Sequence, residues 1–333
     1  MDEKQIKKLA QKLLDETFIQ GYLSAKLKNQ FPKAIFSQTK ITPIKKEIGG
    51  RYYLVIRYNI KNLDRPIFCS ASSSSDRKNA FNALKFICSK LPTTTPLFYS
   101  KQFRAMFYLG VPGKNLQEYI KEHPKKIKDI IILTAELIAK FHQIKINPEK
   151  HNFNHNNSDI ETVTPGIKYS IGRLSEKAPE NISQIKKLFE IINTFDKQNS
   201  SNKKYLIHGD FHPENIIIHN ENPLEITIID YTDICVSDFA RDLGNFLHQL
   251  KYMTSRFNPT LAKNLPEFEK SFLNAYFKKV GIKPTPEIKK RIAFYSAWTA
   301  LRNTIFFLIK KFKETEEAKK SINSAYKYLD NTK

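Results

Sequence analysis

Residues 205–218 read YLIHGDFHPENIII, and this stretch decides how the rest of the chain is interpreted. It packs histidine, aspartate and asparagine into a short loop between an apolar run and a run of β-branched residues that predicts a strand. After a short predicted hairpin, the chain continues as Ile229-Asp230. Asp210 and Asn215 are five residues apart, and Asp230 lies fifteen residues beyond Asn215, at the end of the next predicted strand.

Asp and Asn are common in turns, so Asp210 alone would indicate a turn residue more than a catalytic one. The presence of Asn215, Asp230 and Asp242 at these spacings favours catalysis. Phosphoryl transfer needs a carboxylate that reaches the acceptor hydroxyl, and oxygen ligands that hold Mg²⁺ against the nucleotide phosphates. A loop that places Asp210 near the acceptor, with Asn215 facing Asp230 across a hairpin, supplies that set. Mg²⁺ keeps several waters, so one amide oxygen and one carboxylate suffice as protein ligands.

The same residues carry a resemblance to a known family. The chain resembles the aminoglycoside phosphotransferase and choline kinase-like family, whose members have the kinase-like fold. The match rests on four segments, which are His208-Gly-Asp210 with Asn215, Ile229-Asp230, Asp242-Leu-Gly-Asn-Phe246, and Phe141-His142. The order of the predicted elements extends the resemblance over most of the chain.

The resemblance implies a role for each of these residues. Asp210 would be the catalytic base, and Asn215 and Asp230 would bind Mg²⁺, so these three form the expected catalytic set. His208 would brace the loop, and Asp242 would fix it by accepting backbone hydrogen bonds, so both give structural support. The sequence itself also favours bracing for His208, because a histidine beside a glycine turn is more often structural than catalytic.

The pattern of elements predicts an α+β protein kinase-like fold with a small β-rich N-lobe and a large helical C-lobe. We expect the N-lobe at residues 1–110, with an N-terminal helix, a β-sheet and one helix on the nucleotide side. The C-lobe, residues 111–333, should hold the catalytic loop and the acceptor pocket. The boundary is predicted between Gly110 and Asn115, where the strand pattern stops.

Periodicity predicts individual elements as well. Extended stretches are expected at about 35–46, 51–60, 66–71 and 104–109. One helix is expected over the first segment, where Ile6, Leu9, Leu13 and Phe18 share a face. Further helices are predicted at 182–195, 239–252, 266–279, 287–311 and 315–329. A small hairpin of residues 215–219 and 225–229 interrupts the helical part.

The expected nucleotide-binding residues are Gly49, Gly50 and Ser70. Gly49 and Gly50 form a turn between the first two strands, which is too short for a firm phosphate loop. The family usually places a lysine on the third strand, paired with a helix glutamate. Here Ser70 stands at our best estimate of the lysine position, and Asn82 is near the glutamate position. The nearby basic residues that could substitute are Lys78, Lys85, Arg57 and Lys61.

The predicted function is transfer of the γ-phosphate of ATP (or GTP), with Mg²⁺, to a hydroxyl of a small molecule. Only eleven residues separate Asp230 from Asp242, which leaves no room for a long loop that docks a peptide. We expect the acceptor pocket to be built from residues 182–195 and the helices after Pro266. On the predicted helix 287–311, Trp298 is expected to pack in the core, and a place in the pocket wall is the alternative. An aminoglycoside or choline would need local acidic or aromatic groups.

Two other hypotheses about the function remain open. The missing lysine and glutamate allow a pseudokinase or a ligand-binding module without turnover. The net charge of +22 allows association with nucleic acid or another polyanion. That partner is not favoured, because only ten of the 55 basic residues are arginine and the lysines are spread along the chain.

The chain is predicted to be cytoplasmic and to have no transmembrane segment. Its apolar runs are shorter than the roughly 20 residues that a membrane helix needs. The first residues, MDEK, lack the apolar core of a secretory signal. Cys69, Cys88 and Cys235 lie far apart in the sequence and form no disulfide or zinc pattern, as in proteins of a reducing compartment.

Overall fold

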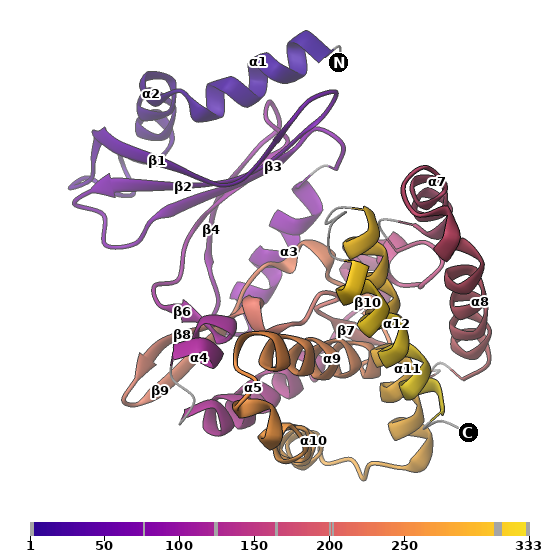
Figure 1. Cartoon of the computed structure of the whole chain (residues 1–333). Helices are drawn as coiled ribbons and strands as arrows, with labels where there is room; N and C mark the ends of the chain where they lie inside the picture. The colour runs from indigo at the N-terminus through magenta and orange to yellow at the C-terminus, as the bar shows by residue number, and fades with distance from the viewer. Residues whose placement is uncertain are drawn as a thin grey trace. The chain divides into compact units, whose positions relative to one another are not determined.

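The computed structural model describes residues 3–75, 77–122, 126–163, 166–199, 201, 203–309 and 315–330 (Figure 1). The chain divides into two compact units, Met1–Gly113 and Lys114–Lys333. Unit 1 is built around a β-sheet, and unit 2 consists mostly of helices. The assignment of the nucleotide to residues 1–110 and of the acceptor to residues 111–333 stays a prediction.

Unit 1 holds one five-stranded antiparallel sheet with the strand order β1-β2-β3-β5-β4. Its elements are α1 (Glu3–Leu14), α2 (Glu16–Leu27), β1 (Ile35–Ile48), β2 (Tyr52–Lys61), β3 (Ile67–Ser72), α3 (Lys78–Cys88), β4 (Thr95–Ser100) and β5 (Ala105–Leu109). The prediction of a single helix over the first segment is wrong, because Asp15 caps a second helix there. Its side chain accepts a hydrogen bond from the backbone N–H of Phe18 at 2.7 Å.

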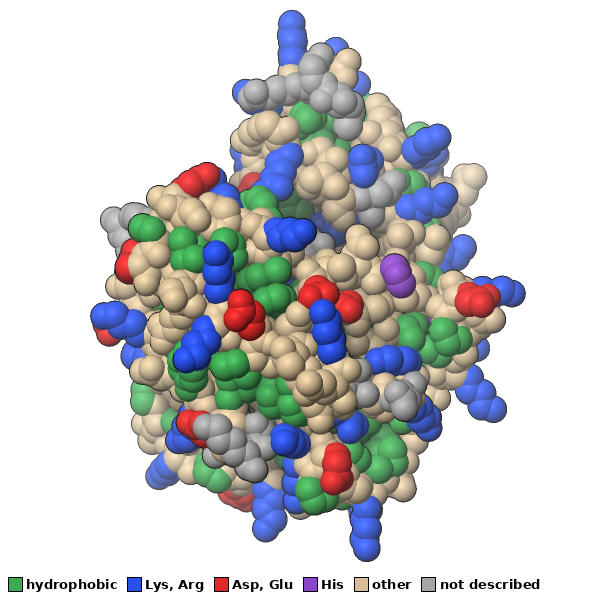
Figure 2. Space-filling view, turned by 90° about the vertical axis from the view of Figure 1, so that its right-hand side faces the viewer, with side chains coloured by type: hydrophobic (Ala, Val, Ile, Leu, Met, Phe, Trp, Pro, Cys, Tyr) green, Lys and Arg blue, Asp and Glu red, His purple; other side chains and the backbone are tan. Residues whose placement is uncertain are grey.

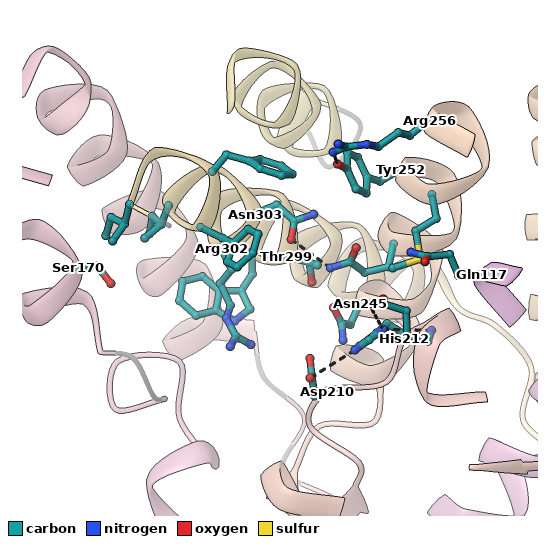
Figure 3. Close-up of a pocket in the computed structure, with 18 of the residues that line it drawn as sticks. Gln117, Ser170, Asp210, His212, Asn245, Tyr252, Arg256, Thr299, Arg302 and Asn303 are labelled. Atoms are coloured by element: carbon teal, nitrogen blue, oxygen red, sulfur yellow. Dashed lines mark hydrogen bonds and ion pairs between the residues drawn. The ribbon is translucent and has the colours of Figure 1, made fainter. Parts of the chain in front are cut away.

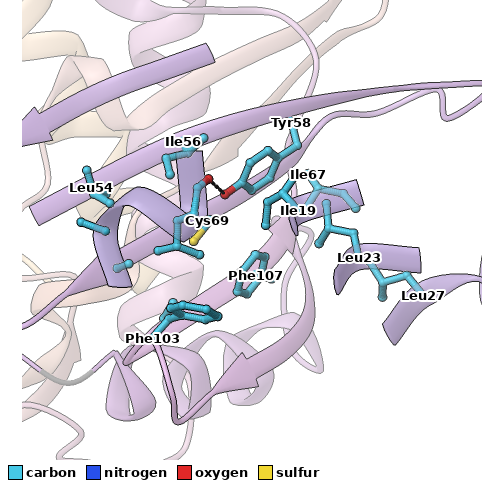
Figure 4. Packing of buried hydrophobic residues seen from close by; sticks show 14 of the residues in the cluster. Ile19, Leu23, Leu27, Leu54, Ile56, Tyr58, Ile67, Cys69, Phe103 and Phe107 are labelled. Carbon is cyan, nitrogen blue, oxygen red and sulfur yellow. Dashed lines mark hydrogen bonds between the residues drawn. The ribbon is translucent and has the colours of Figure 1, made fainter. Parts of the chain in front are cut away.

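The core of unit 1 lies between α2 and one face of the sheet. Residues alternate along β2 between buried and less buried, as expected for a strand with one face against a core. Ile19, Leu23 and Leu27 repeat every four residues along α2 and face the sheet (Figure 4). Tyr58 is fully buried there, and its hydroxyl donates to the carbonyl of Leu13 at 2.8 Å.

Unit 2 begins with β6 (Lys114–Asn115) and α4 (Leu116–Glu122). Its other helices are α5 (Ile127–His142), α6 (Pro148–His151), α7 (Ile167–Lys177), α8 (Ile182–Asn199), α9 (Ala240–Phe257), α10 (Leu265–Val280), α11 (Pro286–Ile309) and α12 (Thr315–Asp330). Short 3-10 turns in the described residues are η2 (His155–Asn157), η3 (Pro179–Asn181), η4 (Pro213–Asn215), η5 (Tyr231–Asp233) and η6 (Leu261–Asn264). The predicted C-terminal helices are confirmed within a few residues, except that 310 and 311 lie outside the described part of the chain.

Two small sheets in unit 2 organise the middle of the chain. β7 (Tyr205–Ile207) pairs with β10 (Cys235–Ser237), and β8 (Ile216–Glu221) forms the predicted hairpin with β9 (Leu224–Ile228). The loop 208–215 therefore leaves one sheet and enters the other. The sequence predicts that the eleven residues between Asp230 and Asp242 are too few for a long loop. In the structure, β10 takes up three of them.

Close packing of α9 against α11 depends on Gly244. A Cβ atom at this position would lie 2.7 Å from the carbonyl oxygen of Ile292 and from the backbone nitrogen of Ser296. Because both are backbone atoms of α11, a larger residue would force the helices apart. Aromatic stacking continues this core, since the ring of Phe246 lies 5.1 Å from that of Phe211 and 4.5 Å from that of Phe272.

Within the described residues, α11 is the one helix long and apolar enough to cross a membrane by length and composition. Of its most apolar 18-residue window, 72% is buried inside the protein. α11 packs against α8, α9 and α12, and a core helix passes the same test. The expected absence of a membrane segment stays a prediction.

Candidate functional site

The loop 208–215 is fixed by a buried carboxylate on α9. Asp242 accepts hydrogen bonds from the backbone N–H groups of His208 at 2.7 Å and Gly209 at 2.9 Å. It also pairs with Nε2 of His142 at 3.0 Å, and Nδ1 of that ring lies 2.8 Å from the hydroxyl of Tyr276. Burial raises the pKa of Asp242, but His142 and the bonds at His208 lower it by more, so its net pKa lies below the usual 3.8.

His208 joins the loop to the end of β9. Its Nε2 lies 2.9 Å from the carbonyl oxygen of Ile229, and its Nδ1 faces the backbone N–H of Asp210 at 3.4 Å. Because a carbonyl only accepts and a backbone N–H only donates, Nε2 donates in the first contact and Nδ1 accepts in the second. His208 is fully buried. Its two contacts connect the start of the 208–215 loop to the residue that follows β9.

Gly209 is required by the backbone of this loop. Its φ angle is +81°, which side-chain-bearing residues rarely adopt. A Cβ atom would also lie 2.3 Å from the carbonyl oxygen of Asp233, and this is a backbone atom that cannot rotate away. Gly209 therefore allows the loop to pass directly over the segment that follows Asp230.

Gly209→Ala should lower the free energy of unfolding by about 2 kcal/mol or more, because left-handed strain alone costs 1–2 kcal/mol. Urea unfolding measures the change. Gly172→Ala is the matched control, since no atom lies within 4 Å of a Cβ on this α7 residue. It should stabilise unit 2 by up to about 1 kcal/mol. Equal effects of the two variants would mean that Gly209 is not needed for the loop conformation.

Asp210 presents its carboxylate at the surface of the loop, with 40% of the side chain exposed. Oδ2 lies 3.5 Å from Nε2 of His212. Burial raises the pKa of Asp210, and the neighbouring His212, Arg302 and His208 lower it by more, so its net pKa lies below the usual 3.8. Burial lowers the pKa of His212, and Asp210 raises it by more, so that its net pKa lies above 6.5. Asp210 is therefore an ionised carboxylate beside the His212 ring.

Asn215 and Asp230 lie side by side at the base of the hairpin. The carbonyl of Asn215 accepts from the backbone N–H of Ile229 at 2.9 Å, one residue before Asp230. Nδ2 of Asn215 donates to the carbonyl of Asp210 at 2.9 Å, which fixes the side-chain amide to the loop. The structure thus links all three predicted catalytic residues through the loop and the hairpin.

The chemistry of Asn215 and Asp230 fits a Mg²⁺ ion. Both offer oxygen atoms, which are the ligands that Mg²⁺ takes. Asp230 is exposed and left-handed (φ 63°), and its Oδ1 accepts from the hydroxyl of Thr232 at 2.8 Å. Asp233, at the end of η5, is a further carboxylate beside this pair. Burial and the charges of Asp210 and Asp230 raise the pKa of Asp233. Arg302 and a 2.9 Å hydrogen bond from Asn157 lower it by less, so its net pKa lies above the usual 3.8.

A cavity of about 600 Å³ opens beside Asp210 within unit 2 (Figure 3). Its polar lining residues are Gln117, Ser170, Asp210, His212, Glu214, Asn245, Gln249, Arg256, Thr299, Arg302 and Asn303, and its aromatic and apolar ones include Tyr169, Tyr252, Phe257, Trp298 and Phe306. These walls come from α4, α7, α9 and α11. Of the segments expected to build the acceptor pocket, α11 lines this cavity, whereas α8, α10 and α12 contribute none of the lining residues. Trp298 both lines the cavity and packs on Phe189, with ring centroids 6.0 Å apart.

The expected nucleotide residues lie in unit 1. Gly49 and Gly50 form the turn between β1 and β2, and a Cβ atom at either would meet nothing within 4 Å. Ser70 is buried in the centre of the sheet, where it pairs with Val55 on β2 and Met106 on β5. Asn82 on α3 is exposed. Among the candidate substitutes, Arg57 donates from Nε to the side chain of Asn59 at 2.9 Å. Their role in binding a nucleotide stays a prediction.

A family model described as the phosphotransferase enzyme family matches residues 71–278, which is more than half of the chain and includes every motif residue of unit 2. The chain belongs to this phosphotransferase family. No curated protein sequence matches it. Membership in this family confirms the predicted resemblance and identifies the protein as a phosphotransferase.

Solved structures of family members share the fold of this phosphotransferase. An ethanolamine kinase from Plasmodium vivax is 14% identical, with a TM-score of 0.64 over 95% of this chain and 87% of that one. A choline kinase from Cryptosporidium parvum is 11% identical, with a TM-score of 0.67 over 95% and 96%. An amicoumacin kinase in complex with AMP-PNP, Ca²⁺ and Ami is 13% identical, with a TM-score of 0.59 over 89% of each chain. The predicted α+β kinase-like fold is confirmed.

Proposed function

We propose that this phosphotransferase moves the γ-phosphate of ATP to a hydroxyl group of a small molecule. The observation that carries the proposal is the placement of ionised Asp210 at the wall of the 600 Å³ cavity, on a loop tied to Asn215 and the base of the hairpin. A new bond forms between the acceptor oxygen and the γ-phosphorus. The bond from that phosphorus to the β,γ-bridging oxygen breaks, and ADP leaves.

Asp210 is proposed to orient the acceptor hydroxyl and to receive its proton. A carboxylate whose pKa is lowered is a weak base, so its larger contribution is to position the oxygen. Phosphoryl transfer tolerates this, because its loose transition state requires little removal of the proton before the new bond forms. His212, at 3.5 Å, keeps the Asp210 carboxylate ionised.

The proposed ligands of Mg²⁺ are the side-chain oxygens of Asn215 and Asp230. The ion would neutralise charge on the nucleotide phosphates when it is bound. Asn215 can hold its oxygen in a constant direction because its Nδ2 is bonded to the loop. For the nucleotide we propose contacts at Gly49, Gly50 and Ser70, with ATP favoured and GTP as the alternative.

A small-molecule acceptor and a cytoplasmic location complete the proposal. The cavity has the size of a small-ligand site, and the Asp230–Asp242 stretch holds η5 and β10. The three cysteines are free thiols, as in a reducing compartment. Nucleic acid is not favoured as a partner, since Lys and Arg side chains are scattered over the face in Figure 2 and are not gathered in one place.

Asp230→Ala should abolish Mg²⁺-dependent binding of ATP. Calorimetric titration of ATP with and without Mg²⁺ measures this for the native protein and the variant. Asp129→Ala is the control, because it removes an equally exposed carboxylate from the first turn of α5. Native protein that binds no nucleotide in either condition would favour the reading as a binding module without turnover.

A further inference from the structure

We propose that the acceptor carries a negatively charged group, a carboxylate or phosphate, beside its hydroxyl and an apolar body, and that Arg302 binds this charge. The inference rests on the proposed function, since it concerns the acceptor of the same site. It excludes polycationic sugars and quaternary or primary amines as acceptors of this chain. The geometry of α11 and the composition of the cavity wall support it.

Arg302 is a cation in the cavity wall whose charge lowers the pKa of Asp210 and Asp233 without a direct contact to either carboxylate. Among the residues that the structure describes, it forms no hydrogen bond or ion pair. In Figure 3 its guanidinium points into the cavity on the side of Asp210. A guanidinium in the cavity wall that contacts no protein acceptor suits an anionic ligand, because arginine binds carboxylate and phosphate with two parallel hydrogen bonds.

The cavity is poor in groups that would bind a cation. Its acidic lining residues are Asp210, which the reaction needs, and Glu214, which lies 3.8 Å from His212 and is half exposed. Two of its aromatic faces are already covered by protein cations. Arg256 lies over the rings of Tyr252 and Phe257 at 5.8 and 5.7 Å, and Lys121 lies over Phe257 at 4.3 Å. A cationic acceptor would have to share these faces with protein cations.

The rim of the cavity supplies an apolar surface. Tyr169 on α7 is 50% exposed, and Phe306 on α11 is 43% exposed. Large apolar side chains that stay exposed beside a cavity commonly contact a ligand. Phe306 follows Arg302 by one helical turn, so α11 presents an apolar group and a charged group along the same wall.

Three compounds that differ only in charge test the inference: para-hydroxymethyl benzoate, the corresponding benzamide and the corresponding benzylamine. Each has the same hydroxyl and the same ring. Ligand-observed NMR in the presence of Mg²⁺ and AMP-PNP gives their dissociation constants. The native protein should bind the benzoate roughly tenfold or more tightly than the benzamide, and the benzylamine most weakly.

Arg302→Gln should reduce binding of the benzoate to the level of the benzamide and leave the benzamide unchanged. Arg173→Gln is the matched control, because it makes the same change at an exposed α7 residue paired with Glu176. It should keep the preference. No preference for the benzoate in the native protein, including no binding of any of the three, would overturn the inference. So would an equal loss for all three in Arg302→Gln, which would assign Arg302 to the transferred phosphoryl group.

Different results would contradict the proposed function and the inference about the acceptor. If native protein binds Mg²⁺-ATP through Asp230 but shows no preference for the anion, the inference about the acceptor is wrong and the proposed function stands. If Mg²⁺-dependent nucleotide binding is itself absent, the proposed function fails. Titration of the nucleotide in the same samples separates these results.

Discussion

Asp210→Asn should reduce the turnover number for phosphoryl transfer by about 10²–10⁴-fold while the protein stays folded and binds nucleotide normally. The amide has the shape of the carboxylate, but it lacks the charge that holds the acceptor hydroxyl in position and cannot receive its proton. The backbone contacts of residue 210 to His208 and Asn215 do not involve its side chain, and the side chain is 40% exposed. The fold therefore does not depend on the charge that is removed.

Steady-state assays of ADP release, together with circular dichroism and urea unfolding, measure this result. Glu214→Gln is the matched control, because it removes a carboxylate from the same loop and the same cavity wall. We expect it to change turnover by less than about tenfold, since Glu214 contacts only the far nitrogen of His212. A native rate in Asp210→Asn would remove Asp210 from the mechanism.

Asp242→Asn should lower the free energy of unfolding by about 3 kcal/mol at neutral pH, because it breaks a buried network that holds the 208–215 loop. A single amide oxygen cannot replace both carboxylate oxygens toward His208, Gly209 and His142. The amide nitrogen would instead face donors. Urea unfolding of the native protein and the variant measures the loss.

The pH dependence of this loss has a definite sign. The pKa of Asp242 in the folded protein lies below its usual 3.8, so its carboxylate contributes stability above that pH. This contribution disappears as the pH falls through the folded-state pKa. The difference between the native protein and Asp242→Asn should accordingly be largest at neutral pH and shrink below about pH 4.

Asp196→Asn is the contrasting control. Burial raises the pKa of Asp196, against a lowering by the hydroxyl of Tyr295, which donates to it at 2.6 Å. Its ionised form is disfavoured by folding, so the amide should change the unfolding free energy by less than about 1 kcal/mol at neutral pH. Equal losses in the two variants would contradict the special role of Asp242.

Local patterns were sufficient to predict much of this fold. The hairpin after Asn215 follows from two short β-branched runs, and the long C-terminal helices follow from their apolar spacing. The break at Asp15 was missed because the apolar face continues across it, and only the capping bond to Phe18 shows that a second helix begins. β4, α4 and α7 were also not predicted, since their apolar residues make no long periodic run.

The candidate site was predictable where it is contiguous in sequence. Residues 208–215 and Asp230 lie on one loop and one hairpin, so their proximity follows from local structure. The cavity wall was not predictable in the same way. Tyr295, Trp298 and Arg302 recur at helical spacing, but spacing does not reveal which residues each side chain contacts. In the structure Tyr295 bonds Asp196, whereas Trp298 and Arg302 line the cavity.

Phosphorus NMR of the native protein with ATP, Mg²⁺ and a mixture of hydroxyl compounds of different charge tests the central claim most directly. The account predicts a new phosphomonoester signal that grows in equal amount with ADP, requires Mg²⁺ and is absent in Asp210→Asn. ATP that is bound with Mg²⁺ but gives no phosphomonoester with any compound would contradict the assignment of this site to phosphoryl transfer.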